Sequence, residues 1–308
     1  MKSRHLIGLE DLSIDDIQEI INTGFVFREV LERPIKRVPT LTGKHIVNLF
    51  FENSTRTKLS FELAEKRLSA DVTNFSASSS SINKGESFKD TVQNICSMKM
   101  DCVVMRHPIP GSILQLTDFV DAVVVNAGDG SHEHPTQALL DMMSLQEKFG
   151  KIKGLKVGIV GDILHSRVAL SNIYGLIKMG AKVKVCGPPH LIQKNIEELG
   201  VKISYDIDEV LEWCDAINVL RIQKERMGVG IIPSVREYRK FFGVTHNRIK
   251  QFKKEIVIMH PGPMNRGVEI DSQVADCDQA IILNQVLNGV AVRMSILYLL
   301  LGNSELGK

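Results

Sequence analysis

The sequence lacks the paired cysteines of a disulfide-bonded protein. Its 308 residues contain 5 cysteines, an odd number, and they are widely scattered with no C-x-x-C spacing. A disulfide framework, a zinc knuckle and a redox pair are therefore not indicated. The pattern favours a reducing compartment, and we expect a cytoplasmic protein.

An excess of charge of one sign is also missing. There are 38 Lys and Arg against 36 Asp and Glu, which gives a net charge of +2. A protein whose main partner is nucleic acid or an anionic membrane needs a dense excess of basic side chains. We expect neither partner, and any anion binding must be local.

Long hydrophobic segments are not found either. The N-terminus runs from charged residues into an acidic stretch, without the apolar core of a secretory signal. No apolar run approaches the roughly 18 residues that a membrane span needs. No membrane segment is expected.

What the chain does contain is an alternation of short apolar runs with amphipathic segments, which predicts βαβ units. The fold class is therefore α/β, with two domains that each carry a mostly parallel sheet flanked by helices. The expected strands are 45–51, 101–105, 122–126, 156–160, 182–186, 216–220 and 255–259. A length of about 150 residues per domain agrees with two domains.

Two glycines and two lysines in 149–154 separate a helical pattern from a new apolar strand, and we place the domain boundary there. The first domain is expected to span 1–150 and to be completed by a C-terminal helix at about 290–308. The second spans 151–289. A helix is also predicted over 57–70, supported by the i,i+4 pair Glu62 and Lys66, and the serine-rich stretch 76–81 is interpreted as a mobile loop.

The strongest chemical signal lies where the first strand meets this helix. Ser54, Thr55, Arg56 and Thr57 place hydroxyls and a guanidinium at a helix start, where backbone N–H groups and the helix dipole favour an anion. Plain helix capping by Ser54 and Thr57 is the simpler alternative. Capping does not require an Arg inside the cluster, so we favour phosphate binding.

Two other patterns invite a cofactor or metal. The strand that ends in Gly161 resembles the start of a dinucleotide-binding turn, but the G-x-G-x-x-G series is incomplete. His132 and His134 form a His-x-His pair that can bind zinc, but no Cys, Asp or Glu cluster with ligand spacing accompanies them. We expect neither a cofactor nor a metal.

With Ser60-Phe61-Glu62, the Ser-Thr-Arg-Thr segment resembles the carbamoyl-phosphate signature of the transcarbamylase family. Further segments agree in order along the whole chain, namely 84–87, 105–108, 129–141, 161–167, 221–226 and 260–263. The resemblance is to the aspartate branch of the family. The ornithine branch has a His-Cys-Leu-Pro motif where this chain has His260-Pro261-Gly262-Pro263.

The resemblance implies two groups of site residues. Carbamoyl phosphate would be held by Ser54, Thr55, Arg56, Thr57, Arg106, His134 and Gln137, together with Ser81 and Lys84 from the neighbouring subunit of a homotrimer. The loop alignment leaves Ser80 as the alternative to Ser81. L-Aspartate would be held by Lys84, Arg167, Arg221 and Gln223, and both substrates by backbone groups of Gly262 and Pro263.

The implied reaction is carbamoyl transfer from carbamoyl phosphate to L-aspartate at a site between the two domains, an early step of pyrimidine synthesis. Arg56, Thr57, Arg106 and His134 would be the catalytic residues, acting through proximity and charge stabilisation. Two alternatives stay open, a transcarbamylase for another amine such as ornithine and a silent scaffold paralogue. A regulatory chain or a dihydroorotase partner also stays open.

Overall fold

The computed structural model describes residues 1–76, 87–222, 234–252 and 254–302. The chain divides into two units. The first unit comprises Met1–Met143 and Leu287–Lys308, and the second comprises Ser144–Val286. The sequence placed the boundary at 149–154, after a helical pattern, whereas this division falls inside helices α5 (Pro135–Phe149) and α11 (Ile282–Leu301).

The first unit contains a parallel sheet in the order β2-β1-β3-β4 among the described residues. Its strands are β1 (His45–Phe50), β2 (Asp71–Ser76), β3 (Cys102–His107) and β4 (Val123–Asp129). Its helices are α1 (Ile14–Glu32), α2 (Thr55–Arg67), α3 (Phe88–Ser97) and α4 (Ser112–Leu116), with most of α5 and α11.

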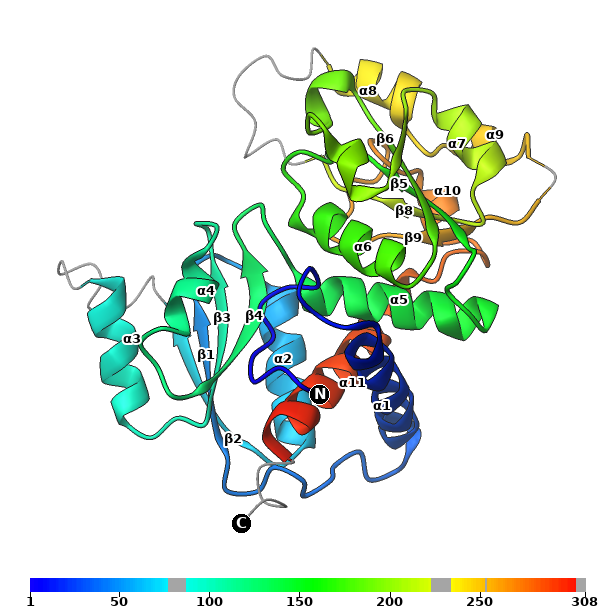
Figure 1. Cartoon of the computed structure of the whole chain (residues 1–308). Helices are drawn as coiled ribbons and strands as arrows, with labels where there is room; N and C mark the ends of the chain where they lie inside the picture. Colours follow the sequence, from blue (N-terminus) through cyan, green and yellow to red (C-terminus); the bar gives the residue numbers. More distant parts are fainter. Residues whose placement is uncertain (77–86, 223–233, 253, 303–308) are drawn as a thin grey trace. The chain divides into compact units, whose positions relative to one another are not determined.

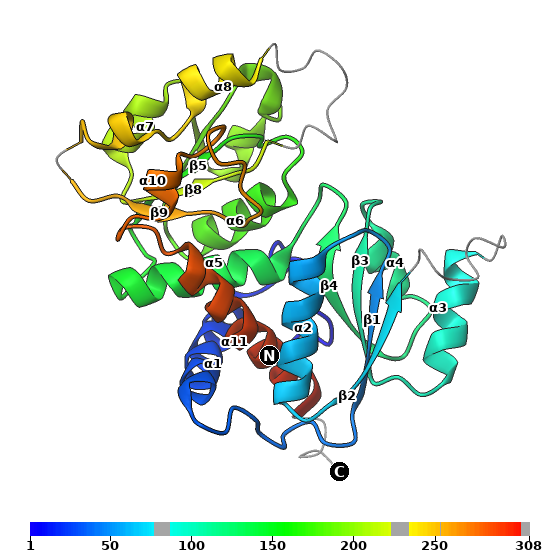
Figure 2. The same ribbon diagram turned by 180° about the vertical axis from the view of Figure 1, so that it is seen from behind.

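Buried residues occupy consecutive positions along β1, β3 and β4. Because successive side chains of a strand point to opposite faces, both faces of the sheet are covered. Val47, Leu49, Val103 and Met105 form one buried cluster with residues of α3 and α4. Helix α2 packs on β1 and β2, and Figure 2 shows it beside the sheet. The apolar core therefore fixes the positions of the carboxyl ends of β1 and β3.

Helix α11 (Ile282–Leu301) lies beside α1 in both ribbon views (Figures 1 and 2). The Ser295 hydroxyl donates to the Ile20 carbonyl oxygen at 2.7 Å, and the Phe27 and Tyr298 rings meet edge to face at 5.6 Å. By length and composition alone α11 could cross a membrane, which the sequence analysis did not anticipate. However, 72% of the 18-residue apolar stretch within α11 is buried inside the protein, as in the core helix of a globular fold.

The second unit contains a parallel sheet in the order β7-β6-β5-β8-β9 within the described part of the chain. Its strands are β5 (Lys156–Val160), β6 (Lys182–Cys186), β7 (Lys202–Ser204), β8 (Ala216–Val219) and β9 (Val257–Met259). Its helices are α6 (Arg167–Lys178), α7 (Ile207–Trp213), α8 (Val235–Phe242), α9 (His246–Ile249) and α10 (Ser272–Ala275), with 3-10 turns η3 (Pro189–Leu191) and η4 (Ile196–Leu199) and the C-terminal part of α5 (Pro135–Phe149).

The predicted fold class is confirmed, since both sheets are parallel and flanked by helices. β5 and β6 have the predicted bounds. The helix predicted over 57–70 is α2, and its Lys66 donates to Glu62 at 2.6 Å. The edge strands β2 and β7 were missed, and Ser76, predicted to begin a loop, is the last residue of β2.

Candidate active site

In the first unit, the candidate residues gather where the chain changes direction across the sheet. From β1 the chain passes to β2 on one side, and it returns to β3 on the other. Ligands in parallel sheets bind beyond the carboxyl ends of the strands at such a switch point. Ser54 to Thr57 follow β1, and Arg106 lies near the end of β3.

Arg106 is joined to the loop after β1 by its side chain and its backbone. Its Nε donates to Glu52 Oε1 at 2.7 Å, and its Nη1 makes a longer hydrogen bond of 3.5 Å to Thr57 Oγ1. The Phe51 N–H donates to the Arg106 carbonyl oxygen at 2.9 Å. The structure thus brings together Arg106 and Thr57, two of the residues implied by the resemblance.

Glu52 positions Arg106, a role that was not predicted from the sequence. Its side chain is only 18% exposed, and that of Arg106 is 14% exposed, so the ion pair is shielded from water. A carboxylate in a predicted anion site fixes the direction of the guanidinium, although its charge opposes the anion. The signal in the sequence was an acidic residue two positions before the Ser-Thr-Arg-Thr segment.

The start of α2 bears on the choice between capping and anion binding. Ser54 occupies the N-cap position with φ −158° and ψ 85°, and within the described residues its side chain makes no capping hydrogen bond. The N–H groups of a first helical turn have no acceptor inside the helix. Ser54 therefore does not act as the side-chain cap that the simpler interpretation assumed.

His134 and Gln137 lie at the start of α5, and Pro135 is its first residue. Both side chains are buried. The hydroxyl of Thr136 is 3.5 Å from His134 Nδ1, and Gln137 Nε2 donates to Asp141 Oδ1 at 3.0 Å. Because a carboxylate only accepts hydrogen bonds, the Gln137 amide nitrogen faces Asp141, and its carbonyl oxygen points elsewhere.

A buried arginine from α11 joins helices α2 and α5. Arg293 Nη1 donates to Ser60 Oγ on α2 at 2.9 Å, and Nη2 donates to Thr136 Oγ1 on α5 at 3.3 Å. Its guanidinium lies 5.0 Å from the centre of the Phe61 ring. Burial lowers the pKa of Arg293 to about 10, and the charge of Asp141 acts against this shift.

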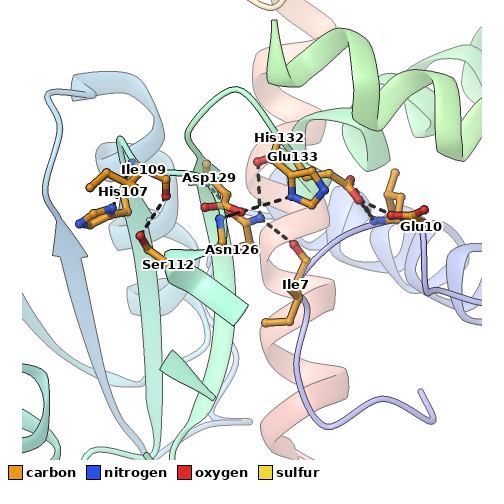
Figure 3. Close-up of polar contacts among 12 residues, drawn as sticks. Ile7, Glu10, His107, Ile109, Ser112, Asn126, Asp129, His132 and Glu133 are labelled. Atoms are coloured by element: carbon orange, nitrogen blue, oxygen red, sulfur yellow. Dashed lines mark hydrogen bonds and ion pairs between the residues drawn. The ribbon is translucent and has the colours of Figure 1, made fainter. Parts of the chain in front are cut away.

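The loop between β4 and α5 is held by contacts shown in Figure 3. The Glu133 carboxylate accepts hydrogen bonds from the backbone of Leu9 at 2.9 and 3.0 Å, and Asn126 Nδ2 donates to the Ile7 carbonyl oxygen at 2.6 Å. Glu133 is fully buried. The N-terminal segment is thereby pinned beside the loop that carries His134.

The two histidines of the His-x-His pair have different neighbours. His132 Nδ1 lies 3.3 Å from Asp129 Oδ2, and this hydrogen bond raises the pKa of His132 above its usual value. Figure 3 shows Asp129 beside His132. His134 Nδ1 lies near the hydroxyl of Thr136 instead. In the ranges that the structure describes, no group of three or more His, Cys, Asp or Glu side chains could hold a metal ion.

The second unit has its own switch point, between β5 and β8. Arg167 is the first residue of α6 after β5, and Arg221 follows β8. A β-carbon on Gly161 would lie 2.9 Å from the Leu220 carbonyl oxygen, and its φ of +135° also favours glycine. Gly161 thus lets the two strand ends approach, which explains this glycine without a dinucleotide.

Gly262 and Pro263 follow β9 and are joined by a cis peptide bond. The Gly262 N–H donates to His260 Nδ1 at 2.8 Å, so the proton of a neutral His260 resides on Nε2, which lies 3.5 Å from Glu269 Oε1. The His260 N–H donates to Gln285 Oε1 at 3.0 Å. Buried side chains therefore fix this turn. Ser81, Lys84 and Gln223 lie outside the described residues.

Two family models match nearly the whole chain. Residues 4–147 match the aspartate/ornithine carbamoyltransferase carbamoyl-P binding domain. Residues 153–300 match the Asp/Orn binding domain of the same family. The first range holds Arg56, Arg106 and His134, and the second holds Arg167 and Arg221.

Curated relatives agree over the same length. The chain is 62% identical over 296 residues to the aspartate carbamoyltransferase catalytic subunit of Christiangramia forsetii, covering 96% of each chain. It is 58% identical over 300 residues to that of Cytophaga hutchinsonii, covering 97% of this chain and 98% of the relative.

Solved structures share the fold. Aspartate transcarbamoylase from Trypanosoma cruzi, solved with carbamoyl phosphate and aspartate, has a TM-score of 0.87 at 30% identity and covers 96% of this chain and 95% of its own. The catalytic subunit of the M. jannaschii enzyme has a TM-score of 0.85 at 35% identity and covers 99% and 100%.

Proposed function

Because the chain belongs to the aspartate/ornithine carbamoyltransferase family, we propose that it transfers a carbamoyl group from carbamoyl phosphate to L-aspartate. The products are N-carbamoyl-L-aspartate and phosphate, and the reaction is an early step of pyrimidine synthesis. The observation that carries the proposal is 62% identity, over 96% of both chains, to a catalytic subunit named for this activity.

The first unit binds carbamoyl phosphate. Arg56, the hydroxyls of Ser54, Thr55 and Thr57, and the first turn of α2 receive the phosphate oxygens. Arg106, held by Glu52, adds a second guanidinium. The Gln137 carbonyl oxygen, turned away from Asp141, accepts from the carbamoyl NH2 group.

The second unit binds L-aspartate. Its two carboxylates call for guanidinium groups, which bind a carboxylate in bidentate geometry, and Arg167 and Arg221 supply them at one switch point. Gln223 completes this set. Ornithine would instead require an anion for its distal ammonium, so the two arginines support an acidic amino acid.

In the reaction, the aspartate amine attacks the carbamoyl carbon, and the carbonyl electrons move to oxygen. Thr57, Arg106 and His134 stabilise this oxyanion. The electrons then return, the bond from carbon to the phosphate oxygen breaks, and the leaving phosphate takes the proton from the amine. No covalent enzyme intermediate is required, because orientation and charge stabilisation lower the barrier.

A parallel assay tests the substrate. Purified protein is offered carbamoyl phosphate with either L-aspartate or L-ornithine, and the ureido product is measured. We expect product from aspartate alone. Product from ornithine alone would overturn the assignment of the second unit, and binding of both substrates without turnover would identify a silent scaffold paralogue.

The active form is a cytoplasmic homotrimer whose subunits share active sites. Ser81 and Lys84 of each subunit contribute to the active site of the neighbouring subunit. Leu59 and Leu63, exposed on α2 by 63% and 37%, offer apolar surface for a subunit contact. Mixing inactive Arg56→Ala and Lys84→Ala chains should restore part of the activity. Mixed trimers that stay inactive would contradict the shared site, and fractionation of native cells would check the compartment.

A further inference from the structure

The second unit has a basic pocket apart from the strand ends that carry Arg167 and Arg221. Its volume is about 450 Å³, which is in the range of small-molecule sites. Neither arginine lines it. Its lining residues come from the start of α7, from α8 and from the segment around α9. The charged residues that line it are Asp208, Arg236, Arg239, Lys240 and Arg248.

Two of the four cationic side chains form ion pairs within the described residues. Arg248 Nε pairs with Asp208 Oδ1 at 2.6 Å, and its Nη1 donates to the Gly243 carbonyl oxygen at 2.7 Å, close to the end of α8. Arg239 forms an ion pair with Asp271. These contacts fix the walls of the pocket and neutralise two of its positive charges.

The other two cations, Arg236 and Lys240, lie one turn apart on α8, so they share a face of the helix. Both are exposed, and neither forms an ion pair with another residue in the described ranges. After the two ion pairs are counted, the pocket keeps an excess of two positive charges. The amide side chains of Asn247 and Gln251 also line it and add hydrogen-bond donors.

We propose that this pocket binds a phosphate dianion, either inorganic phosphate or the phosphate group of a small metabolite. Arg236 and Lys240, which form no ion pair within the described residues, carry two positive charges that match the charge of such a group, and a guanidinium beside an ammonium suits its oxygen atoms. Preformed walls reduce the entropy lost on binding. The proposal does not depend on the carbamoyl-transfer reaction, because none of the pocket residues belongs to the candidate active site.

Isothermal titration calorimetry tests the pocket on the full-length chain. The Arg56→Ala variant serves as the background, since it weakens the candidate catalytic phosphate site. Inorganic phosphate and glycerol 3-phosphate are titrated separately at low salt. We expect one site per chain for at least one of them, and in the wild-type chain one further site for inorganic phosphate.

The pocket variant Arg236→Gln/Lys240→Gln should weaken this binding by about tenfold or more, since two charge-assisted contacts are lost. The matched control is Lys250→Gln/Lys254→Gln, which removes the same charge from exposed lysines outside the pocket lining. The control should bind as before. Arg236→Lys, which keeps the charge, should bind more tightly than Arg236→Gln, and this comparison excludes a folding defect.

Tighter binding of glycerol 3-phosphate would identify an organic phosphate as the ligand, and equal or weaker binding would identify the free anion. Both results support the proposal. It is overturned if neither probe binds in the Arg56→Ala background, if the pocket variant binds unchanged, or if the control loses binding equally. A failure of carbamoyl transfer would leave these outcomes unaffected.

Discussion

The helices that follow the central strands of the two units begin differently. In the first unit, α2 starts after Ser54, whose side chain makes no capping hydrogen bond within the described residues. In the second unit, α6 starts after Ser166, whose hydroxyl accepts from the Ala169 N–H at 3.2 Å. The same residue type at the same position thus serves two purposes.

The difference follows the chemistry that each unit is proposed to perform. A phosphate dianion binds well to backbone N–H groups, hydroxyls and the positive end of a helix dipole. A side-chain cap would occupy one of these N–H groups, and the first turn of α2 lacks such a cap among the described residues. Carboxylates bind to guanidinium groups in bidentate geometry. Helix α6 can therefore be capped by Ser166, while the side chain of its first residue, Arg167, supplies the positive charge. A helix start can bind an anion directly or only position a cationic side chain.

The largest expected effect comes from Arg293, the buried residue that joins α2 and α5 in the first unit. Arg293→Met removes the hydrogen bonds to Ser60 and Thr136 and a buried positive charge near Asp141. Hydrogen bonds made by a charged group contribute about 1.5–3 kcal/mol each, so the loss of two should cost about 3–5 kcal/mol. Chemical denaturation measures this loss. Ser295→Ala, which removes one hydrogen bond from the same helix, should cost about 1 kcal/mol.

If Arg293 acts on the first unit's site, carbamoyl phosphate should show a higher KM, and aspartate should not. Equal changes in the two KM values would contradict an effect of Arg293 that is confined to the carbamoyl phosphate site of the first unit. Arg293→Lys should recover part of the stability because it keeps a positive charge.

The second prediction compares Arg56→Ala with Arg167→Ala in steady-state kinetics. Arg56 is expected to contact the phosphate as charge develops, so its loss should lower kcat by about 10²–10³-fold. Arg167 is expected to contact aspartate equally in ground and transition states, so its loss should raise the KM for aspartate by about 10–100-fold. A normal aspartate KM in Arg167→Ala would remove Arg167 from the aspartate site.

The third prediction concerns pH and Glu65, which is fully buried on α2. Burial raises the pKa of Glu65 from 4.5 to about 8, although Asn48 Nδ2 donates to its Oε2 at 2.8 Å. Since the folded protein keeps this proton and the unfolded chain releases it, stability should fall as pH rises from about 4.5 to about 8. The slope is about 1 kcal/mol per pH unit.

Denaturation curves between pH 5 and pH 8 measure this slope, and Glu65→Gln should flatten it. Glu209 in the second unit is the control. The pKa of Glu209 is lowered by Lys184 and Ser204, so its stabilisation is lost only at more acidic pH, and Glu209→Gln should leave the slope unchanged. An unchanged slope in Glu65→Gln would show that Glu65 is ionised in the folded protein.

The smallest effects come from the two serines themselves. Ser166→Ala should cost about 1 kcal/mol of stability, because a helix cap is lost. Ser54→Ala should change the stability by a few tenths of a kcal/mol and should instead weaken carbamoyl phosphate binding. Thermal melts and the KM for carbamoyl phosphate distinguish the two, and equal destabilisation would show that both serines act as caps.

The sequence was sufficient for the fold class because apolar strands such as β5 and β6 are buried on both sides of a parallel sheet. It was insufficient for β2 and β7, whose edge positions allow polar residues at alternate places. The Ser-Thr-Arg-Thr segment was found because its residues are adjacent. The hydrogen bonds of Glu52 with Arg106 and of Ser60 with Arg293 join residues 54 and 233 positions apart, so only the folded chain shows them.

The missing side-chain cap of α2 also has a kinetic consequence. The amide hydrogens of Thr55 and Thr57 lie in a first turn without intrahelical acceptors, so they should exchange with deuterium faster than those of the capped turn of α6. A phosphate bound there would slow the exchange of these amides and leave α6 unaffected. The protein thus carries a residue-level reporter of occupancy in its own backbone.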